Sequence, residues 1–151
     1  MTNRLNEWAA RHGVSPRALA ELKTLYDPPT TMVDAGSESA TQAALRIAAP
    51  KLGCSLWRNN SGAAVDDSGR VVRYGLENIS KKLNDVFKSS DLIGIARGRF
   101  VAVEVKAPGW RGPATAHEQA QANFLRTVES LGGIGMFCTD VNQYVERINR
   151  L

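Results

Sequence analysis

The chain contains few cysteines, which limits the ways in which its fold can be held together. Only Cys54 and Cys138 occur in 151 residues, and their wide separation fits neither a zinc site nor a dense disulfide framework. A chain of this length is expected to bury roughly two-thirds of its unfolded surface in one domain, so no covalent staple is required. We therefore expect two buried free thiols and a reducing compartment, the cytoplasm of the cell that expresses the chain.

Long apolar runs are also absent from the sequence. No stretch approaches the roughly 18 consecutive apolar residues that indicate a membrane-spanning helix, and the first residues lack the pattern of a signal peptide. Neither membrane insertion nor secretion is therefore expected, and a membrane is not a predicted partner.

Acidic residues are the minority among the charged ones. The chain has 15 Asp and Glu against 19 Lys and Arg, a net charge of +4 and a pI near 9.3. This excess favours a polyanionic partner, although a surplus of this size also serves solubility. Many of the basic residues gather in the middle of the chain: Arg70, Arg73, Lys81, Lys82, Lys88, Arg97, Arg99, Lys106 and Arg111. Such clusters provide the phosphate contacts that dominate affinity for nucleic acid.

A pair of predicted strands brings acidic and basic residues together in this basic region. Residues 100–106 are rich in valine and predict a strand, in which side chains two apart share a face. Glu104 and Lys106 therefore project together. Residues 91–95 predict a second strand, and the short glycine-centred stretch 97–99 predicts the hairpin turn between the two. Asp91, at the start of one strand, can thus meet Glu104 near the end of its partner.

Two carboxylates and a lysine in this arrangement suit metal-dependent hydrolysis of a phosphodiester. Magnesium is bound by one or two carboxylates together with substrate phosphate oxygens, and a lysine offsets charge in the transition state. The alternative is an ordinary ion pair on a solvated sheet face, with Asp91 as a turn residue. Because the strand around Glu104 is apolar enough to be central, and central strands seldom bear charge, the first interpretation is favoured.

These residues, with several local signatures, resemble the VRR-NUC (virus-type replication-repair nuclease) domain of the PD-(D/E)XK nuclease superfamily. The resemblance runs from Ser37 to Thr139. Its further signatures are the stretches 38–42, 57–62, 90–94 and 132–133. It implies a restriction-endonuclease-like α/β core, with a mixed central β-sheet flanked by helices on both faces. The order of predicted elements fits that core, because the helix after Thr115 can serve as a crossover between parallel strands.

The resemblance also implies the site residues. Glu38, Asp91, Glu104 and the backbone carbonyl of Val105 would bind Mg²⁺, for which Mn²⁺ can substitute, and Lys106 would be the catalytic lysine. The family's helix glutamine, followed three residues later by an aromatic, matches Gln121, with Gln119 as a competitor.

Stand-alone relatives are homodimers that cut branched DNA such as four-way junctions, so the same activity and assembly are expected here, with a viral or mobile-element origin. The leading hypothesis is a metal-dependent DNA endonuclease. The alternatives are a nucleic-acid-binding module that keeps the fold without cutting, and a structural or phosphate-metabolising protein.

We expect a helical extension over residues 1–36 and the nuclease core over residues 37–151. Residues 2–26 predict two short helices, with Ser15 and Pro16 marking the second start, and the prolines in 27–31 end the pattern. At helical spacing, Trp8 is interpreted as a core residue in preference to a base-stacking one.

Several elements of the core are predicted by capping and periodicity. Ser37 or Ser39 caps a helix that runs to about Ala49. Residues 54–59 and 70–74 are expected to pair as a hairpin around a turn at 66–69. Residues 75–90 are expected to form a loop that closes over the substrate. A helix from Thr115 to about Leu131 has Ala122, Leu125, Val128 and Leu131 inward, followed by a strand at 134–138 and a helix at 142–151.

Candidate contacts to nucleic acid are basic, amide or aromatic residues near the predicted site: Arg58, Asn59, Arg73, Lys81, Lys82, Trp110 and Arg111. Trp110 is interpreted either as a stacking residue or as a side chain folded back onto the core. His117 is interpreted either as a proton carrier or as a surface or capping histidine.

Overall fold

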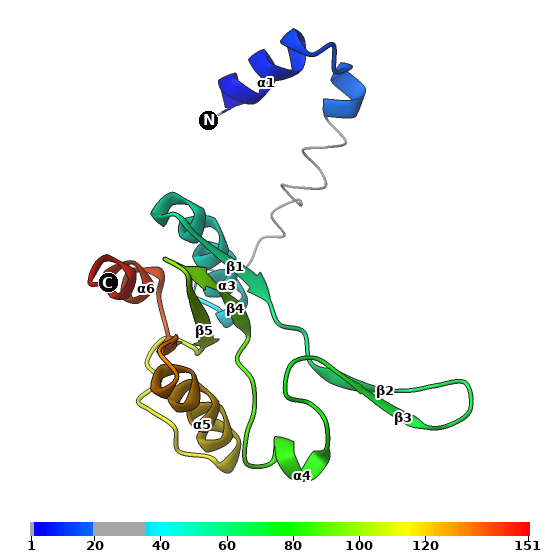
Figure 1. The fold of residues 1–151 in the computed structure, drawn as a ribbon, viewed down its shortest axis with the longest axis vertical. Helices are drawn as coiled ribbons and strands as arrows, with labels where there is room; N and C mark the ends of the chain where they lie inside the picture. Colours follow the sequence, from blue (N-terminus) through cyan, green and yellow to red (C-terminus); the bar gives the residue numbers. More distant parts are fainter. Residues whose placement is uncertain (1, 20–35) are drawn as a thin grey trace. The chain divides into compact units, whose positions relative to one another are not determined.

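The computed structural model describes residues 2–19 and 36–151 (Figure 1). The chain divides into two compact units, Met1–Val33 and Asp34–Leu151. The predicted break at 27–31 lies outside the described residues. No described helix is long and apolar enough to cross a membrane.

In the first unit, helix α1 (Thr2–Arg11) is followed by a second helical start at Pro16. The Ser15 hydroxyl accepts a hydrogen bond from the Ala18 N–H, so the predicted cap is confirmed. The prediction that Trp8 packs in a core is wrong. It is 42 % exposed, and its ring centre lies 5.0 Å from that of His12, which follows the helix.

A mixed four-stranded sheet forms the centre of the second unit, as predicted. Its strands are β1 (Cys54–Arg58), β4 (Leu92–Ala96), β5 (Arg99–Val105) and β6 (Ile134–Cys138), in the order β1-β4-β5-β6. The pairs β1–β4 and β4–β5 are antiparallel, and β5–β6 is parallel. The central strand β5 therefore has a hydrogen-bonded neighbour on each side.

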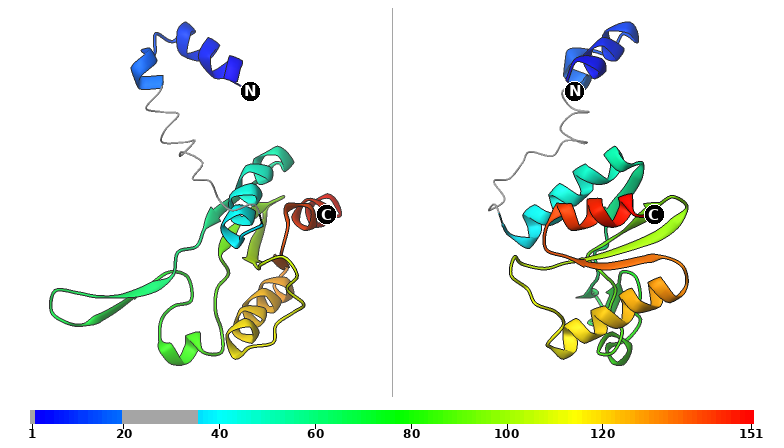
Figure 2. Two further views of the ribbon diagram at one scale, coloured as in Figure 1. Left: turned by 180° about the vertical axis from the view of Figure 1, so that it is seen from behind. Right: turned by 90° about the vertical axis from the view of Figure 1, so that its left-hand side faces the viewer.

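Helices cover both faces of this sheet (Figure 2). On one face, α3 (Glu38–Ala48) and α6 (Val141–Asn149) bury Leu45, Tyr144 and Ile148 against the β5 valines. On the other face, α5 (Ala116–Ser130) buries Phe124, Leu125 and Val128 against Ala102. Because side chains alternate along β5, this strand contributes to an apolar layer on each face of the sheet. A charged side chain on β5 therefore lies between the sheet and a covering helix.

The β4–β5 hairpin is closed by a two-residue turn. Ala96 faces Arg99, and both residues between them have positive φ, 49° at Arg97 and 76° at Gly98. This pattern is that of a type I′ turn, whose twist matches the strands and fixes their register. The predicted hairpin is confirmed.

Helix α5 connects β5 to β6 as the predicted crossover, and it begins with the predicted capping box between Thr115 and Glu118. The prediction that Leu131 points inward is wrong, because this side chain is 82 % exposed. The helix ends at Ser130, and Leu131 has non-helical backbone angles, so the inward stripe does not extend to it. Phe124 is buried instead, together with Leu125 and Val128.

The predicted pairing of residues 54–59 with 70–74 is wrong. Strand β3 (Val71–Tyr74) pairs with β2 (Gly62–Val65) in a separate two-stranded sheet, and β1 pairs with β4 instead (Figure 1). Neither face of this hairpin is buried, so the small residues of β2 do not alternate between apolar and polar. Without that alternation the strand could not be predicted from the sequence. The turn at 66–69 is confirmed: Asp66 Oδ1 accepts hydrogen bonds from the N–H groups of Ser68 and Arg70.

Two short helices complete the described second unit, η1 (Ala49–Leu52) and α4 (Lys81–Asn84), the latter capped by Ser80. Cys54 and Cys138 are free and buried, as predicted. Burial raises the pKa of the Cys138 thiol to about 11, so this thiol is held in its unreactive protonated form.

Candidate active site

Glu104 is a buried acid on the central strand. Only 2 % of its surface is exposed. Its Oε1 accepts a hydrogen bond from Lys106 Nζ at 3.0 Å and another from Gln121 Nε2. This contact confirms the prediction that Glu104 and Lys106, two residues apart, project to the same side.

Asp91 joins this group from the neighbouring strand. Its N–H donates to Glu104 Oε2 at 3.2 Å, and its own Oδ2 accepts from the Val105 N–H at 3.0 Å. The Asp91 carboxylate thus accepts from the backbone at the end of β5, and the Glu104 carboxylate accepts from the backbone just before the start of β4. The predicted meeting of Asp91 with Glu104 is confirmed, and the backbone of Val105 lies against Asp91.

Helix α5 contributes Gln121 and not Gln119. The buried Gln121 accepts a hydrogen bond from Lys106 Nζ at 2.8 Å through Oε1 and donates to Glu104 through Nε2. Gln119 is exposed and donates to the Pro113 carbonyl at 2.8 Å. The geometry therefore separates the two candidates that sequence left open: Gln121 lies with the acids.

Glu38 reaches the site from the first turn of α3, where Ser37 caps the helix. Its Oε1 accepts a hydrogen bond from the Ala107 N–H at 3.0 Å, next to Lys106. The side chain is exposed, and its charge is close enough to raise the pKa of Asp91. The three predicted acids therefore gather around the end of β5.

Burial is the largest cause that raises the pKa values of both inner acids, and a neighbouring negative charge adds to it in each case. Loss of hydration raises the pKa of Glu104 to about 7, with the negative charge of Asp91 as the next cause and the Lys106 contact acting against both. Burial likewise raises the pKa of Asp91, and the hydrogen bond from Val105 opposes this. A site that holds two desolvated acids side by side favours a nearby cation.

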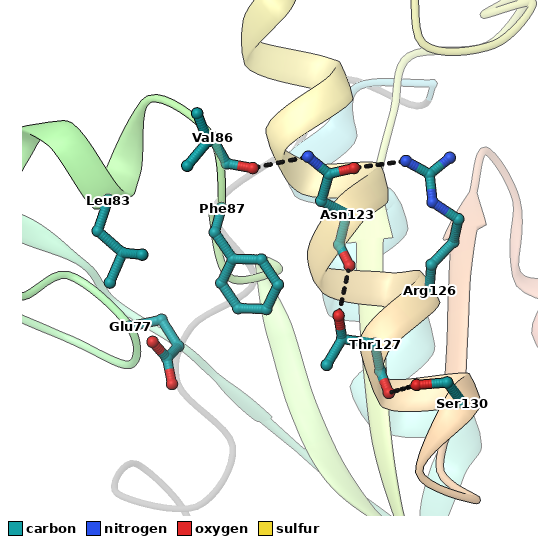
Figure 3. A pocket seen from close by; sticks show the side chains of 8 residues that line it. All are labelled: Glu77, Leu83, Val86, Phe87, Asn123, Arg126, Thr127 and Ser130. Atoms are coloured by element: carbon teal, nitrogen blue, oxygen red, sulfur yellow. Dashed lines mark hydrogen bonds between the residues drawn. The ribbon is translucent and has the colours of Figure 1, made fainter.

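One of the acids, Asp91, lies in the wall of a polar cleft of about 520 Å³. Asp91 and Gln121 lie in its wall, together with Gln42, Arg58, Asn59, Asn60, Ser61, Tyr74, Lys88, Ser89, Ser90 and His117. Of the predicted nucleic-acid contacts, Arg58 and Asn59 are therefore in the cleft. A larger pocket, of about 770 Å³, lies between α4 and α5 and contains none of the predicted site residues (Figure 3).

The other predicted contacts lie elsewhere. Arg73 donates to Asn78 Oδ1 at 3.4 Å, and Lys81 pairs with Asp85 at 3.6 Å across one turn of α4. Lys82 and Arg111 are exposed outside the cleft wall. These residues were predicted from their charge, but charge alone does not determine which residues line the same cleft.

Trp110 is folded back onto the protein, the second of the two interpretations. Its ring centre lies 4.5 Å from that of Phe137, and its Nε1–H donates to Glu118 Oε1 at 2.7 Å. His117 stands in the cleft wall beside Lys88. Gln42, Ser61 and Tyr74 were not anticipated in the wall, since only the tertiary fold brings them together.

The donor set fits a magnesium ion of the kind that keeps several waters. No group of three or more His, Cys, Asp or Glu side chains that could hold a metal ion occurs in the described residues. Two carboxylates suffice for Mg²⁺ when substrate oxygens complete the shell. Within the described part of the chain, Asp91 Oδ1 and Glu38 Oε2 accept no hydrogen bond, so both oxygens can serve as ligands.

No family model, no curated protein and no solved structure matches this chain. Membership of the VRR-NUC family and a restriction-endonuclease-like core therefore stay predictions. Residue chemistry and geometry are what support a function.

Proposed function

We propose that this protein is a Mg²⁺-dependent DNA endonuclease that hydrolyses phosphodiester bonds, with Mn²⁺ able to substitute. The observation that supports it best is the hydrogen-bonded group Asp91, Glu104, Lys106 and Gln121, of which Asp91 and Gln121 line a polar cleft. Burying two acids and a lysine at a strand end costs stability, so a group of this kind is expected where it has a function. Hydrolysis of a phosphodiester uses these residue types.

Each residue has a role in this proposal. Asp91 and Glu104 would hold the ion with Glu38 and the Val105 carbonyl, and the bound ion would polarise the phosphate and lower the pKa of a water. Lys106 would offset the charge that grows on the phosphate. Gln121 accepts from Lys106 and donates to Glu104, so it holds both in one orientation.

The proposal extends to fold family, substrate and assembly. A mixed four-stranded sheet with acids at the ends of two adjacent strands supports a restriction-endonuclease-like core of the VRR-NUC type. We propose branched DNA, including four-way junctions, as the substrate and a homodimer as the active form, because one site per chain cuts two strands symmetrically only when two copies act. Light scattering with and without junction DNA tests the dimer, and a monomer mass in both samples would contradict it.

A second candidate is a nucleic-acid-binding module that does not cut. It is favoured by the saturation of Glu104: Oε1 accepts from Lys106 and Gln121, and Oε2 accepts from the Asp91 N–H. A carboxylate held in this way gives up protein hydrogen bonds when it binds an ion.

Cleavage of labelled DNA distinguishes the two candidates. Wild type, Asp91→Ala and the control Asp85→Ala are incubated with duplex, flap and four-way-junction DNA in Mg²⁺, in Mn²⁺ and in chelator. Asp85 is exposed on the surface by α4, so its loss is a matched removal of one carboxylate. We expect cleavage by wild type and Asp85→Ala with either metal, and none by Asp91→Ala. Intact DNA in every wild-type reaction, with binding retained, would favour the non-catalytic module.

A further inference from the structure

The segment that leads to Asp91 is fixed to helix α5 by its side chains and backbone. The Phe87 ring packs edge-on against Phe124, with ring centres 5.5 Å apart. Asn123 Nδ2 donates to the Val86 carbonyl at 2.7 Å (Figure 3), and the Lys88 N–H donates to the Ala120 carbonyl at 3.1 Å. The backbone of Lys88 therefore has a defined position relative to the helix.

The residues after Lys88 are fixed equally well from the other side. The buried Ser89 donates through its hydroxyl to the Leu76 carbonyl at 2.7 Å. Asn59 Nδ2 donates to Ser89 Oγ at 2.9 Å and to the Ser90 carbonyl at 2.8 Å. Lys88 is consequently held between two anchored stretches, unlike a lysine on a solvated loop.

The Lys88 ammonium is directed to a histidine and not to an acid. Its Nζ lies 3.4 Å from His117 Nδ1, on the first turn of α5. An ammonium group only donates, so this contact is a hydrogen bond when Nδ1 has no proton and the ring proton is on Nε2. Burial, followed by the charges of Lys88 and Lys106, lowers the pKa of His117 and favours this neutral form. The neutral ring still has one N–H to donate.

Lys88 and Arg58, the basic residues in this part of the cleft, form no ion pair within residues 36–151. In residues 36–151, no Asp or Glu oxygen lies within 4.0 Å of the charged atoms of Lys88 or Arg58. Asp91 is the one acid in the cleft wall, and it already accepts from Val105. A half-buried lysine, an arginine and a histidine N–H together suit an anion with several acceptor oxygens, which is the chemistry of a phosphate.

We propose that Lys88 and His117 form a second phosphate subsite, which binds a backbone phosphate of nucleic acid next to the linkage held at Asp91 and Glu104. The inference rests on the proposed function, because the subsite binds the DNA strand next to the bond that is cut. The subsite also fixes the 5′-to-3′ direction of the bound strand, because it lies on one side of the acids.

Binding of fluorescent four-way-junction DNA, measured by anisotropy in chelator, tests the subsite without any cleavage. The variant is Lys88→Ala, and the matched control is Lys82→Ala, which removes the same charge from the same segment at an exposed position outside the cleft wall. We expect binding about tenfold weaker for Lys88→Ala, the effect of losing one charged hydrogen bond. The slope of log K against log salt should fall by about 0.9, the value for one phosphate contact. Lys82→Ala should change both far less.

A scan of DNA with single neutral methylphosphonate linkages locates the contact. Wild type should lose affinity at a linkage beside the cut position, and Lys88→Ala should be indifferent there. Adding His117→Ala to Lys88→Ala should weaken binding by less than the product of the two single effects, because both contact one phosphate. Thermal melting of each variant verifies that it is folded, and Lys88→Arg, which keeps the charge, should retain most of the affinity.

Equal losses for Lys88→Ala and Lys82→Ala, or a variant still sensitive at every linkage, would overturn the subsite. Absence of any DNA binding by wild type would overturn it as well. Failure of the proposed function gives a different result: selective loss of binding in Lys88→Ala, with no cleavage by wild type in Mg²⁺ or Mn²⁺.

Discussion

The central sheet and the β2–β3 hairpin place charged and apolar residues in opposite ways. In the sheet, Glu104 is 2 % exposed between two layers of helices. In the hairpin, Val65 and Val71 face each other across the strands and are 68 % and 59 % exposed. Folding alone favours neither arrangement, because burial suits valine and hydration suits glutamate. Both regions therefore depart from the distribution of charged and apolar residues that folding alone favours.

The two regions also differ in how they are stabilised. The sheet has strands paired on both sides of β5 and two apolar layers. An isolated two-stranded hairpin is marginal in water, and this one is fixed at its base. The buried Asn78 donates through Nδ2 to the carbonyls of Gly62 at 2.6 Å and Tyr74 at 2.8 Å.

The largest expected effect is on activity and concerns the buried charge of the sheet. Glu104→Gln should lower the cleavage rate by roughly 10²- to 10³-fold, the size typical of losing one electrostatic group at a reaction centre. The initial rate on junction DNA in Mg²⁺ measures it, with circular dichroism as the test of folding. Glu129→Gln, the same change at the surface of α5 where Glu129 pairs with Arg147, is the control and should cut normally. Equal rates for both variants would remove Glu104 from the site.

The next effect compares one substitution in the two regions. A Cβ at Gly94 in the sheet would lie 1.9 Å from the Ser55 carbonyl oxygen, so Gly94→Ala should cost about 3 kcal/mol through forced separation of β1 and β4. A Cβ at Gly62 in the hairpin would lie 2.5 Å from the Tyr74 hydroxyl, which can swing aside. Gly62→Ala should therefore stay within about 1 kcal/mol of wild type. Urea unfolding measures both, and similar midpoints would mean that the hairpin is as tightly packed as the sheet.

A smaller contrast replaces valine with threonine, which has nearly the same shape. Val103 is fully buried in β5, so Val103→Thr should lower the free energy of unfolding by about 1–3 kcal/mol through an unsatisfied hydroxyl. Val71→Thr in the exposed strand should change it by less than about 0.5 kcal/mol. If the hairpin is covered in a dimer, Val71→Thr will instead lower the midpoint, and the midpoint of wild type will rise with the logarithm of protein concentration.

The smallest effect concerns a half-buried acid in a helix cap, in contrast to the fully buried Glu104. Hydrogen bonds from the Thr115 and Ala114 N–H groups, and from Trp110, lower the pKa of Glu118 to about 2. The folded pKa lies below the unfolded one, so the carboxylate stabilises the fold above about pH 4.5, and this is lost as the pH falls towards 2. Glu118→Gln should lower the melting temperature at pH 7, and the difference should shrink steadily below pH 4.5. A difference independent of pH would point to packing as its cause.

Local patterns were enough to predict the elements around the site. The turn at Arg97 and Gly98, the valine alternation of β5 and the capping box at Thr115 each depend on neighbouring residues, and all are confirmed. Pairing of Asp91 with Glu104 followed from the hairpin alone. The choice of Gln121 over Gln119 did not, since it depends on the rotation of α5 against the sheet.

Contacts between distant segments lay beyond the sequence. Strand β2 has no buried face and hence no apolar alternation, so the partner of β3 was misassigned. The basic cluster in the sequence included Arg73, Lys81, Lys82 and Lys88 alike. Of these four, Lys88 alone lies in the cleft wall, next to Phe87, which packs on Phe124 of α5. Composition indicates that a basic surface exists, but only packing decides which of its residues face one another.

The attachment of the hairpin has a mechanical consequence. Asn78 ties the hairpin base to the same stretch whose Leu76 carbonyl receives the Ser89 hydroxyl, and Ser89 is joined in turn to Asn59 in the cleft wall. The base of the hairpin and the wall of the cleft therefore belong to one hydrogen-bonded network. Loss of the Asn78 amide would remove support from both at once.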